Sequence, residues 1–152
     1  MSELVGQCWL LRDLSGNEIE ALLSHVEKAS FERGDFIIER GRKNDSLWIV
    51  VSGEVGVVRP GTESSTRDIV KTLGRGDLFG EMSWLDGQSA STSLAALDAC
   101  DVLRIRFKHF DKFLGANPDA HINVLRKFAI NLSHRLRDGQ SKPEQIKQSN
   151  GN

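Results

Sequence analysis

The sequence is poor in cysteine and in long apolar runs. Its 152 residues include two cysteines, Cys8 and Cys100, too few for a disulfide framework and without the paired spacing of a zinc site. We read both as small buried side chains and expect a reducing compartment. No stretch approaches about 18 consecutive apolar residues, and residues 1–11 contain no run long enough for a signal peptide. The sequence therefore predicts a soluble, cytoplasmic protein that does not associate with membranes.

Net charge is also close to zero. Lysine and arginine total 20 and aspartate and glutamate total 21, which gives a formal charge of -1. Bulk charge therefore indicates neither nucleic-acid binding nor an acidic tail. Hydrophobic residues make up 39% and charged residues 27%, as in ordinary globular domains. The length suffices for one domain with its own core.

The residues that are present divide the chain into three zones. Apolar residues between 13 and 29 have helical spacing, and Ser15 with Glu18 forms a capping box at the start. From 31 to 106 the pattern changes to short bulky or β-branched runs separated by turn residues about every eight to twelve positions. This pattern predicts an all-β sandwich or barrel. The expected strands are 36–38, 47–51, 55–58, 69–73 and 102–105.

Glycine is concentrated in the middle zone. Nine of the 14 glycines lie between residues 34 and 87, where tight corners need positive φ. The run Arg33-Gly34-Asp35-Phe36-Ile37 is echoed 42 residues later by Arg75-Gly76-Asp77-Leu78-Phe79. We interpret the echo as two related corners of a two-layer roll, because a solenoid would need more repeats.

The last zone is helical. Residues 107–114 form a short helix, and Asn117-Pro118 begins a longer one that we expect to end at Gly139. The longer helix carries an apolar stripe, formed by Ile122, Leu125, Phe128, Ala129, Leu132 and Leu136. Residues 140–152 are polar with a single isoleucine. We therefore expect one domain over 1–139 followed by a disordered tail over 140–152.

Residues 76–85 carry the most specific chemical suggestion. Gly80 and Glu81 open a short apolar run that fits about one or two helical turns. Free N–H groups at a helix start attract an anion, and a glycine lets a ligand approach the backbone. Glu81 is a candidate acceptor for a sugar hydroxyl, and the alternative is an ordinary first-turn acid favoured by the helix dipole. Trp84 either packs inward or stacks on a base, and we favour packing.

The chain resembles a known family, the cyclic nucleotide-binding domains of catabolite activator proteins, cyclic-nucleotide-dependent kinase regulators and gated channels. The resemblance covers about residues 13–137 and implies a mainly β fold: a double-stranded β-helix, or jelly-roll-like β-roll, with an N-terminal helix and C-terminal helices. It also implies a phosphate-binding cassette, here residues 79–93. The residues that carry the resemblance are Gly34-Asp35, Gly41, Leu47-Trp48-Ile49, Gly53 and Gly76 to Ser83. The first half of the implied site is Phe79, Gly80, Glu81, Met82 and Ser83.

The second half of the cassette departs from the family pattern. Where the family has an arginine that grips the cyclic phosphate, this chain has Ala90, followed by Ser91 and Thr92. Losing a charge-assisted hydrogen bond of about 1.5–3 kcal/mol weakens binding about ten- to a hundredfold or more. Ser91 and Thr92 offer hydroxyl donors, or they belong to a polar corner before a strand that starts near Ser93. An arginine from another strand is a candidate replacement, although an exposed surface position is the first expectation for each of Arg59, Arg75 and Arg104.

The resemblance implies a stand-alone regulatory or sensor module that binds cyclic AMP, cyclic GMP or a related phosphate ligand weakly. The alternative is a ligand-free module that keeps the fold and uses its helical stripe to form a homodimer or to dock another protein. Only residues 139–152 follow the long helix, which leaves no room for a helix-turn-helix domain, so we expect no DNA binding. The four histidines lack metal-ligand spacing, and no base lies near Ser83 or Ser91 in the sequence. We expect no cofactor, no metal and no enzyme activity.

Overall fold

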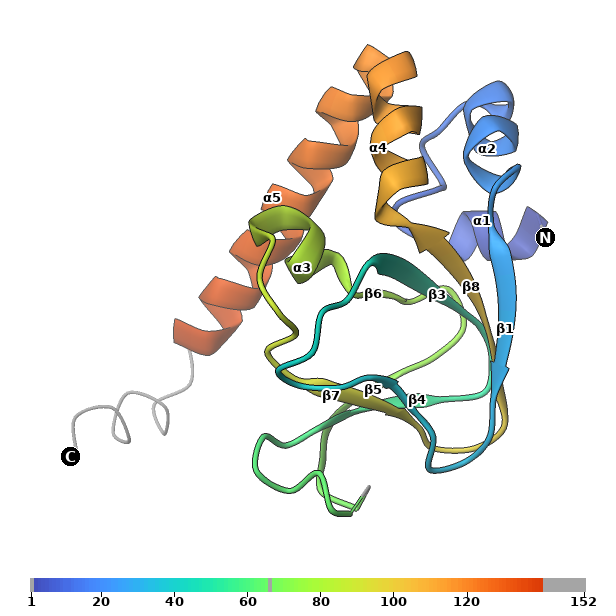
Figure 1. Ribbon diagram of the computed structural model, residues 1–152. Helices are drawn as coiled ribbons and strands as arrows, with labels where there is room; N and C mark the ends of the chain where they lie inside the picture. Colours follow the sequence, from blue (N-terminus) through green and yellow to red (C-terminus); the bar gives the residue numbers. More distant parts are fainter. Residues whose placement is uncertain (1, 66, 141–152) are drawn as a thin grey trace. The chain divides into compact units, whose positions relative to one another are not determined.

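A computed structural model describes residues 2–65 and 67–140 (Figure 1). The chain divides into two units, one ending at Ala116 and the other beginning at Asn117. The second unit contains the helix α5 (Pro118–Gln140). The first unit contains, in chain order, α1 (Ser2–Gln7), α2 (Gly16–Leu23), β1 (Glu27–Phe31), β2 (Phe36–Ile38), β3 (Ser46–Ser52), β4 (Val55–Val58), β5 (Ile69–Leu73), β6 (Leu78–Phe79), α3 (Glu81–Asp86), β7 (Ser93–Ala96), β8 (Cys100–Arg106) and α4 (Phe107–Ala116).

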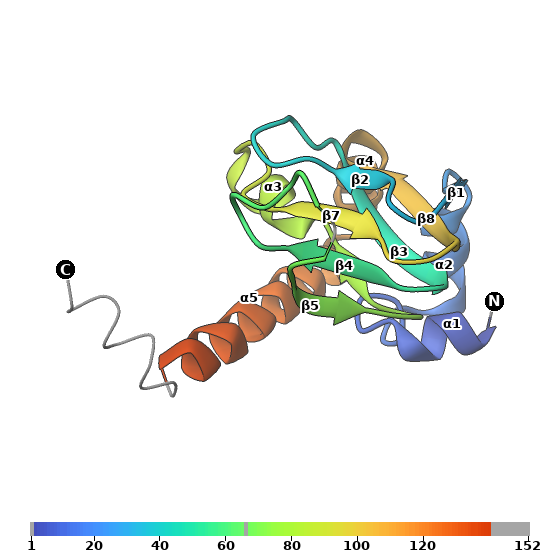
Figure 2. The same cartoon turned by 90° about the horizontal axis from the view of Figure 1, so that it is seen from below.

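The strands of the first unit form two antiparallel four-stranded sheets, ordered β1-β8-β3-β6 and β2-β7-β4-β5. Figures 1 and 2 show that the sheets face each other, with α2 and α4 on the outer side of the first sheet. The predicted mainly β roll with flanking helices is confirmed. Apolar side chains from both sheets fill the space between them, and we call this set the roll core: Ile38, Trp48, Val50, Val55, Leu73, Phe79, Leu94, Ala96, Cys100 and Val102.

The two echoed segments form the same turn. Gly34 and Gly76 have φ values of 92° and 88°, which a side chain would strain. In each turn the aspartate carboxylate accepts a hydrogen bond from the N–H three residues before it, at 2.9 Å for Asp35 and 2.8 Å for Asp77. The first turn leads into β2 and the second into β6, and these two strands belong to different sheets. The interpretation of the echo as two related corners is confirmed.

The predicted helix over 13–29 is wrong in its second half. Its start is confirmed, because Ser15 and Glu18 form the capping box before α2. The helix ends at Leu23, and the hydroxyl of Ser24 donates to a backbone carbonyl of the last turn. Residues 27–31 instead form β1, which pairs with β8 along its whole length. Pairing within a sheet therefore outweighed the local helical spacing.

The five predicted strands are all present, three of them with the predicted bounds. The pattern missed β1, β6 and β7. β6 has only two residues, and β7 is buried at all four positions and lacks both alternation and β-branched residues. β7 begins at Ser93, which agrees with the second of the two interpretations of Ser91 and Thr92, a polar corner before a strand.

The helical third zone follows the prediction closely. α4 is present, and α5 begins at Pro118 and extends one residue past Gly139, its predicted end. In the predicted stripe Phe128 is buried, whereas Ile122, Leu125 and Leu136 are exposed. Of the expected tail, residues 141–152 lie outside the described residues. No helix in the described part has the length and apolar character needed to span a bilayer.

Both cysteines are buried, as the sequence predicted, and neither forms a disulfide. Cys8 follows α1 and is fully buried, and Cys100 belongs to the roll core. Burial raises the pKa of the Cys100 thiol, and nearby carboxylates act in the same direction. This thiol stays protonated and behaves as an apolar side chain.

Candidate functional site

The predicted short helix of the cassette is confirmed as α3. Gly80 precedes it with φ of 90° and provides no side-chain cap. A Cβ at Gly80 would lie 2.7 Å from the carbonyl oxygen of Ser46 and 2.9 Å from the amide nitrogen of Asn44. Both the backbone conformation and the lack of space therefore require glycine here. Gly87, with φ of 69°, ends the helix after less than two turns.

The structure brings three residues of the first half together at the end of β6. Phe79 is buried, and its ring stacks on Trp48 with centroids 6.2 Å apart. Gly80 follows it, and Glu81 at the first position of α3 is only 5% exposed. A buried carboxylate is uncommon, because removing it from water is costly unless polar groups surround it.

The two remaining residues of the first half differ from each other. Ser83 is buried, and its carbonyl accepts the hydrogen bond that ends α3. Met82 is 43% exposed, unlike Phe79, Glu81 and Ser83, which are buried. The inward-facing part of the predicted site is thus smaller than the sequence motif.

The two halves of the cassette both contribute to the interior of the roll. The Ala90 side chain packs against this core, which includes Phe79 and Trp48. Its backbone is fixed by two hydrogen bonds, from Ala90 N–H to the Arg42 carbonyl at 2.9 Å and from Gly41 N–H to the Ala90 carbonyl at 2.8 Å. An apolar methyl group thus stands where the resemblance placed a cation.

The hydroxyl residues after Ala90 lie closer to the surface. Ser91 is exposed and Thr92 is half-buried. Ser93 is buried at the start of β7, and its Oγ accepts a hydrogen bond at 2.8 Å from the N–H of Arg40. Ser93 therefore joins β7 to the segment after β2.

Trp84 packs against the protein, as we favoured. Its Nε1 donates to Oδ1 of Asp111 at 2.8 Å, and its ring meets Phe110 edge-on with centroids 4.9 Å apart. Both partners belong to α4, which follows β8 in the chain. Trp84 therefore holds α3 to α4.

Two of the three candidate arginines lie on the surface. Arg59 pairs with Asp68 at 3.0 Å. Arg75 donates to Oε1 of Gln7 at 2.9 Å and to the carbonyl of Val51 at 2.7 Å. Both are exposed, as expected.

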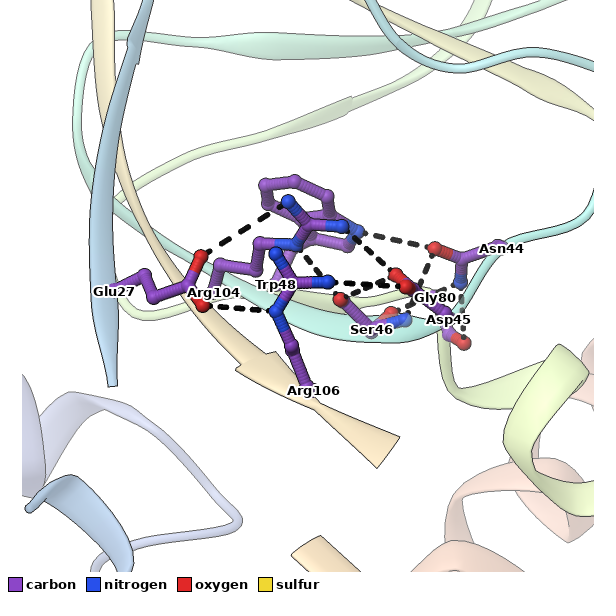
Figure 3. Close-up of polar contacts among 8 residues, drawn as sticks. All are labelled: Glu27, Asn44, Asp45, Ser46, Trp48, Gly80, Arg104 and Arg106. Atoms are coloured by element: carbon purple, nitrogen blue, oxygen red, sulfur yellow. Dashed lines mark hydrogen bonds and ion pairs between the residues drawn. The ribbon is translucent and has the colours of Figure 1, made fainter. Parts of the chain in front are cut away.

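Arg104 departs from that expectation. Its side chain is 26% exposed and lies beside Trp48 and Ser46 of the neighbouring strand β3 (Figure 3). Its Nε donates to Oγ of Ser46 at 2.8 Å, and its NH2 donates to Oδ1 of Asp45 at 2.8 Å. The guanidinium carbon lies 5.0 Å from the ring centroid of Trp48. The expectation of a surface position is wrong for Arg104, because strand alternation turns it inward.

A polar connection leads from this arginine to the start of α3. Trp48 Nε1 donates to Oδ1 of Asn44 at 3.3 Å. The amide nitrogen of Asn44 donates to the carbonyls of Ser46 at 2.9 Å and of Gly80 at 3.1 Å. Figure 3 shows Asn44 joined by dashed lines to Trp48, Ser46 and Gly80.

Two carboxylates and a second arginine complete what we call the arginine cluster: Glu27, Asp45, Ser46, Arg104 and Arg106. Arg106 donates to Glu27 at 2.8 Å and to Asp45 at 3.3 Å. The hydrogen bond from Arg106 holds the pKa of Glu27 below its usual value. Burial by itself would raise the pKa of Asp45, but hydrogen bonds from Arg104 and Ser46 outweigh it and leave that pKa lowered. Two positive and two negative charges therefore face each other at neutral pH.

The sequence named Arg104 as a candidate but missed its partners Glu27 and Asp45, and it missed Asn44, which bonds Trp48 and Gly80. One signal was available. Positions 102, 104 and 106 of one strand alternate inward, so the two arginines interrupt an apolar face. Within residues 2–65 and 67–140, no three His, Cys, Asp or Glu side chains are grouped as a metal site would need.

The fold and the site together define a double-sheet β-roll in which a short glycine-led helix connects β6 with β7. The profile of the cyclic nucleotide-binding domain family matches residues 28–117. The chain therefore belongs to the cyclic nucleotide-binding domain family.

Individual relatives agree with this family. The chain is 29% identical over 119 residues to the cAMP-activated global transcriptional regulator CRP of Escherichia coli O157:H7, covering 78% of this chain and 54% of that protein. It is 30% identical over 97 residues to the cAMP-dependent protein kinase regulatory subunit of Mycosarcoma maydis, covering 64% of this chain and 18% of the subunit. The chain thus spans about half the length of the transcriptional regulator and less of the kinase subunit.

A solved structure shows the same fold. The N-terminal domain of a transcriptional regulator from Streptomyces coelicolor A3(2) superposes with a TM-score of 0.75 at 21% identity, covering 92% of this chain and 96% of that one. At this level of identity the comparison establishes the fold, and ligand chemistry must be argued from this chain's own residues.

Proposed function

We propose that this protein is a regulatory module that binds a cyclic nucleotide or a related phosphate compound with low affinity through residues 79–92. The buried Glu81 beside Gly80 carries the proposal. A carboxylate at 5% exposure is suited to accept a hydrogen bond from a ribose hydroxyl away from water. Low affinity follows from Ala90, because a methyl group offers a phosphate no countercharge.

Family membership supports a role in regulation. The relatives that match include a transcriptional regulator, a kinase regulatory subunit and a potassium channel. We assign this chain ligand binding without catalysis. Cytoplasmic location and the lack of DNA binding remain predictions.

Titration calorimetry with cyclic AMP and cyclic GMP, each extended to millimolar concentration, tests the proposal. We expect weak saturable binding of at least one ligand. Ala90→Arg should strengthen it about ten- to a hundredfold, because a charge-assisted hydrogen bond is restored. Ser89→Arg is the matched control, since it adds the same charge at an exposed neighbouring position. No heat and no thermal shift with either ligand would refute the proposed function.

A second candidate function is a ligand-free interaction module. The packing of Ala90 against the roll core and the exposed apolar residues of α5 favour it. The exposed residues are Ile122, Leu125, Ile130 and Leu136. In this case Ile122→Glu should convert a dimer to a monomer in sedimentation experiments, whereas Asn123→Glu should not. A wild-type protein that sediments as a monomer would count against the homodimer.

A further inference from the structure

The cassette of this chain contains no arginine or lysine between Gln88 and Leu103, so a bound phosphate would need its cation from elsewhere in the fold. The residues that contact the cassette's two ends limit the choice. Gly80 contacts Asn44 and the Ser46 carbonyl, while Ala90 packs against the core that contains Trp48. The Gly80 end of the cassette therefore meets the start of β3, and the Ala90 end packs against the core to which β3 contributes.

Arg104 reaches the same place from β8. In the sheet it lies directly opposite Trp48, and Trp48 in turn lies opposite Phe79, the residue before Gly80. The guanidinium contacts Ser46, and two hydrogen bonds of Asn44 connect the Ser46 and Gly80 carbonyls. The side chains of Arg59 and Arg75 instead bond to Asp68, to Gln7 and to the Val51 carbonyl, which all lie outside the cassette.

We propose that Arg104 is the cation that binds the ligand phosphate in this site, supplied by β8 in place of the cassette arginine. This inference rests on the function proposed above. Its hydrogen bonds to Ser46 and Asp45 use two of five guanidinium donors, and its remaining contact, to Glu27, is long at 4.0 Å. Donors therefore remain for an anion. Stacking on Trp48 holds the planar group in a fixed orientation.

Asp45 acts as the partner that the ligand displaces. Its side chain is 56% exposed and can turn to water, and it also contacts Arg106, which would keep it paired. When the ligand phosphate replaces the Asp45 carboxylate, the Arg104 guanidinium still has an anionic partner. Competition with Asp45 lowers affinity, which agrees with the weak binding proposed for the module.

The first test compares two arginines of the same cluster. Arg104→Gln should weaken binding of cyclic AMP or cyclic GMP about ten- to a hundredfold, measured by calorimetry on the full chain. Arg106→Gln removes the same charge from the same face of β8, but its Nε is held by Glu27, so we expect less than about a threefold change. Equal losses in both variants would overturn the inference, because bulk charge would then explain the effect. Thermal unfolding of each variant checks that it is folded.

Two further variants separate a ligand contact from damage to the fold. Asp45→Asn removes the competing charge, and we expect binding to become about two- to tenfold tighter. In the Ala90→Arg background, Arg104→Gln should lose much less affinity than in the wild type, because both arginines serve one phosphate. Additive effects, or weaker binding by Asp45→Asn, would contradict the inference.

The uncharged nucleoside adenosine distinguishes phosphate recognition from base recognition. Arg104→Gln should leave its binding unchanged while weakening that of cyclic AMP. If the wild type binds neither cyclic nucleotide, the proposed function and this inference both fall. If the wild type binds and Arg104→Gln binds equally well, only the assignment of Arg104 is refuted.

Discussion

The two corners of the roll, residues 32–35 and 74–77, are built from the same hydrogen bonds but lead into different structures. In the first corner the N–H of Gly34 donates to the Ala96 carbonyl at 2.8 Å. The N–H of Ala96 donates back to the Asp35 carbonyl at 2.8 Å. The corner is thereby fixed to the strand beside it.

The second corner repeats this pattern on the other sheet. Gly76 N–H donates to the Val50 carbonyl at 2.8 Å, and Val50 N–H donates back to the Asp77 carbonyl at 3.0 Å. The surroundings differ. A Cβ at Gly34 would meet nothing within 4 Å, whereas one at Gly76 would lie 2.8 Å from the Cβ of Gln7 and 2.9 Å from its carbonyl oxygen.

The two corners also lead into unlike segments. After β2 the chain enters the exposed loop that carries Arg40 and Gly41, whereas after β6 it turns at Gly80 into the helix that begins with the buried Glu81. The same local turn therefore serves both sheets as a scaffold. The chemistry of the candidate site depends on the residues after the turn and on the strands that meet them.

The largest expected difference between the corners comes from glycine. Gly34→Ala should destabilise the protein by about 1–2 kcal/mol, because alanine is strained at positive φ. Gly76→Ala adds a collision with the backbone of Gln7, so we expect about 3–4 kcal/mol. Urea unfolding of both variants measures this. Equal losses would show that the contact with the N-terminal segment is not rigid.

The aspartates should instead behave alike. Asp35→Ala and Asp77→Ala each remove one carboxylate acceptor from an exposed turn, and we expect each to cost about 1 kcal/mol. The difference between the two variants should stay below about 0.5 kcal/mol. A larger difference in the same urea experiment would break the equivalence of the corners.

The corners could be predicted because their requirements are local. A positive φ selects glycine, and a carboxylate that bonds the N–H three residues earlier selects aspartate, so Gly34-Asp35 and Gly76-Asp77 are visible in the sequence. The short helix after Gly80 was predictable for the same reason. Glycines at positive φ stand at both of its ends, although the close approach of Ser46 and Asn44 to Gly80 is a tertiary contact that the sequence does not show.

The arginine cluster could not be predicted in this way, because it depends on register between distant strands. Arg104 meets Trp48 only because β8 and β3 pair with those residues opposite each other. A shift of one residue would turn Arg104 outward. Glu27 was assigned to a helix, so its approach to Arg106 could not be foreseen.

The smallest expected effect comes from the arginines that precede the two glycines. Arg75 donates to Gln7 and to the Val51 carbonyl, whereas the Arg33 side chain makes no hydrogen bond or ion pair within the described residues. Arg75→Ala should therefore cost about 0.5–1 kcal/mol, because its hydrogen bonds are exposed. Arg33→Ala should change stability by less than about 0.5 kcal/mol. Thermal unfolding of each variant, alone and combined with Gln7→Ala, measures these effects. Once Gln7 is replaced, Arg75→Ala should lose less stability, whereas the effect of Arg33→Ala should not change. Equal losses of stability in both arginine variants would mean that the contact between Arg75 and Gln7 does not stabilise the second corner.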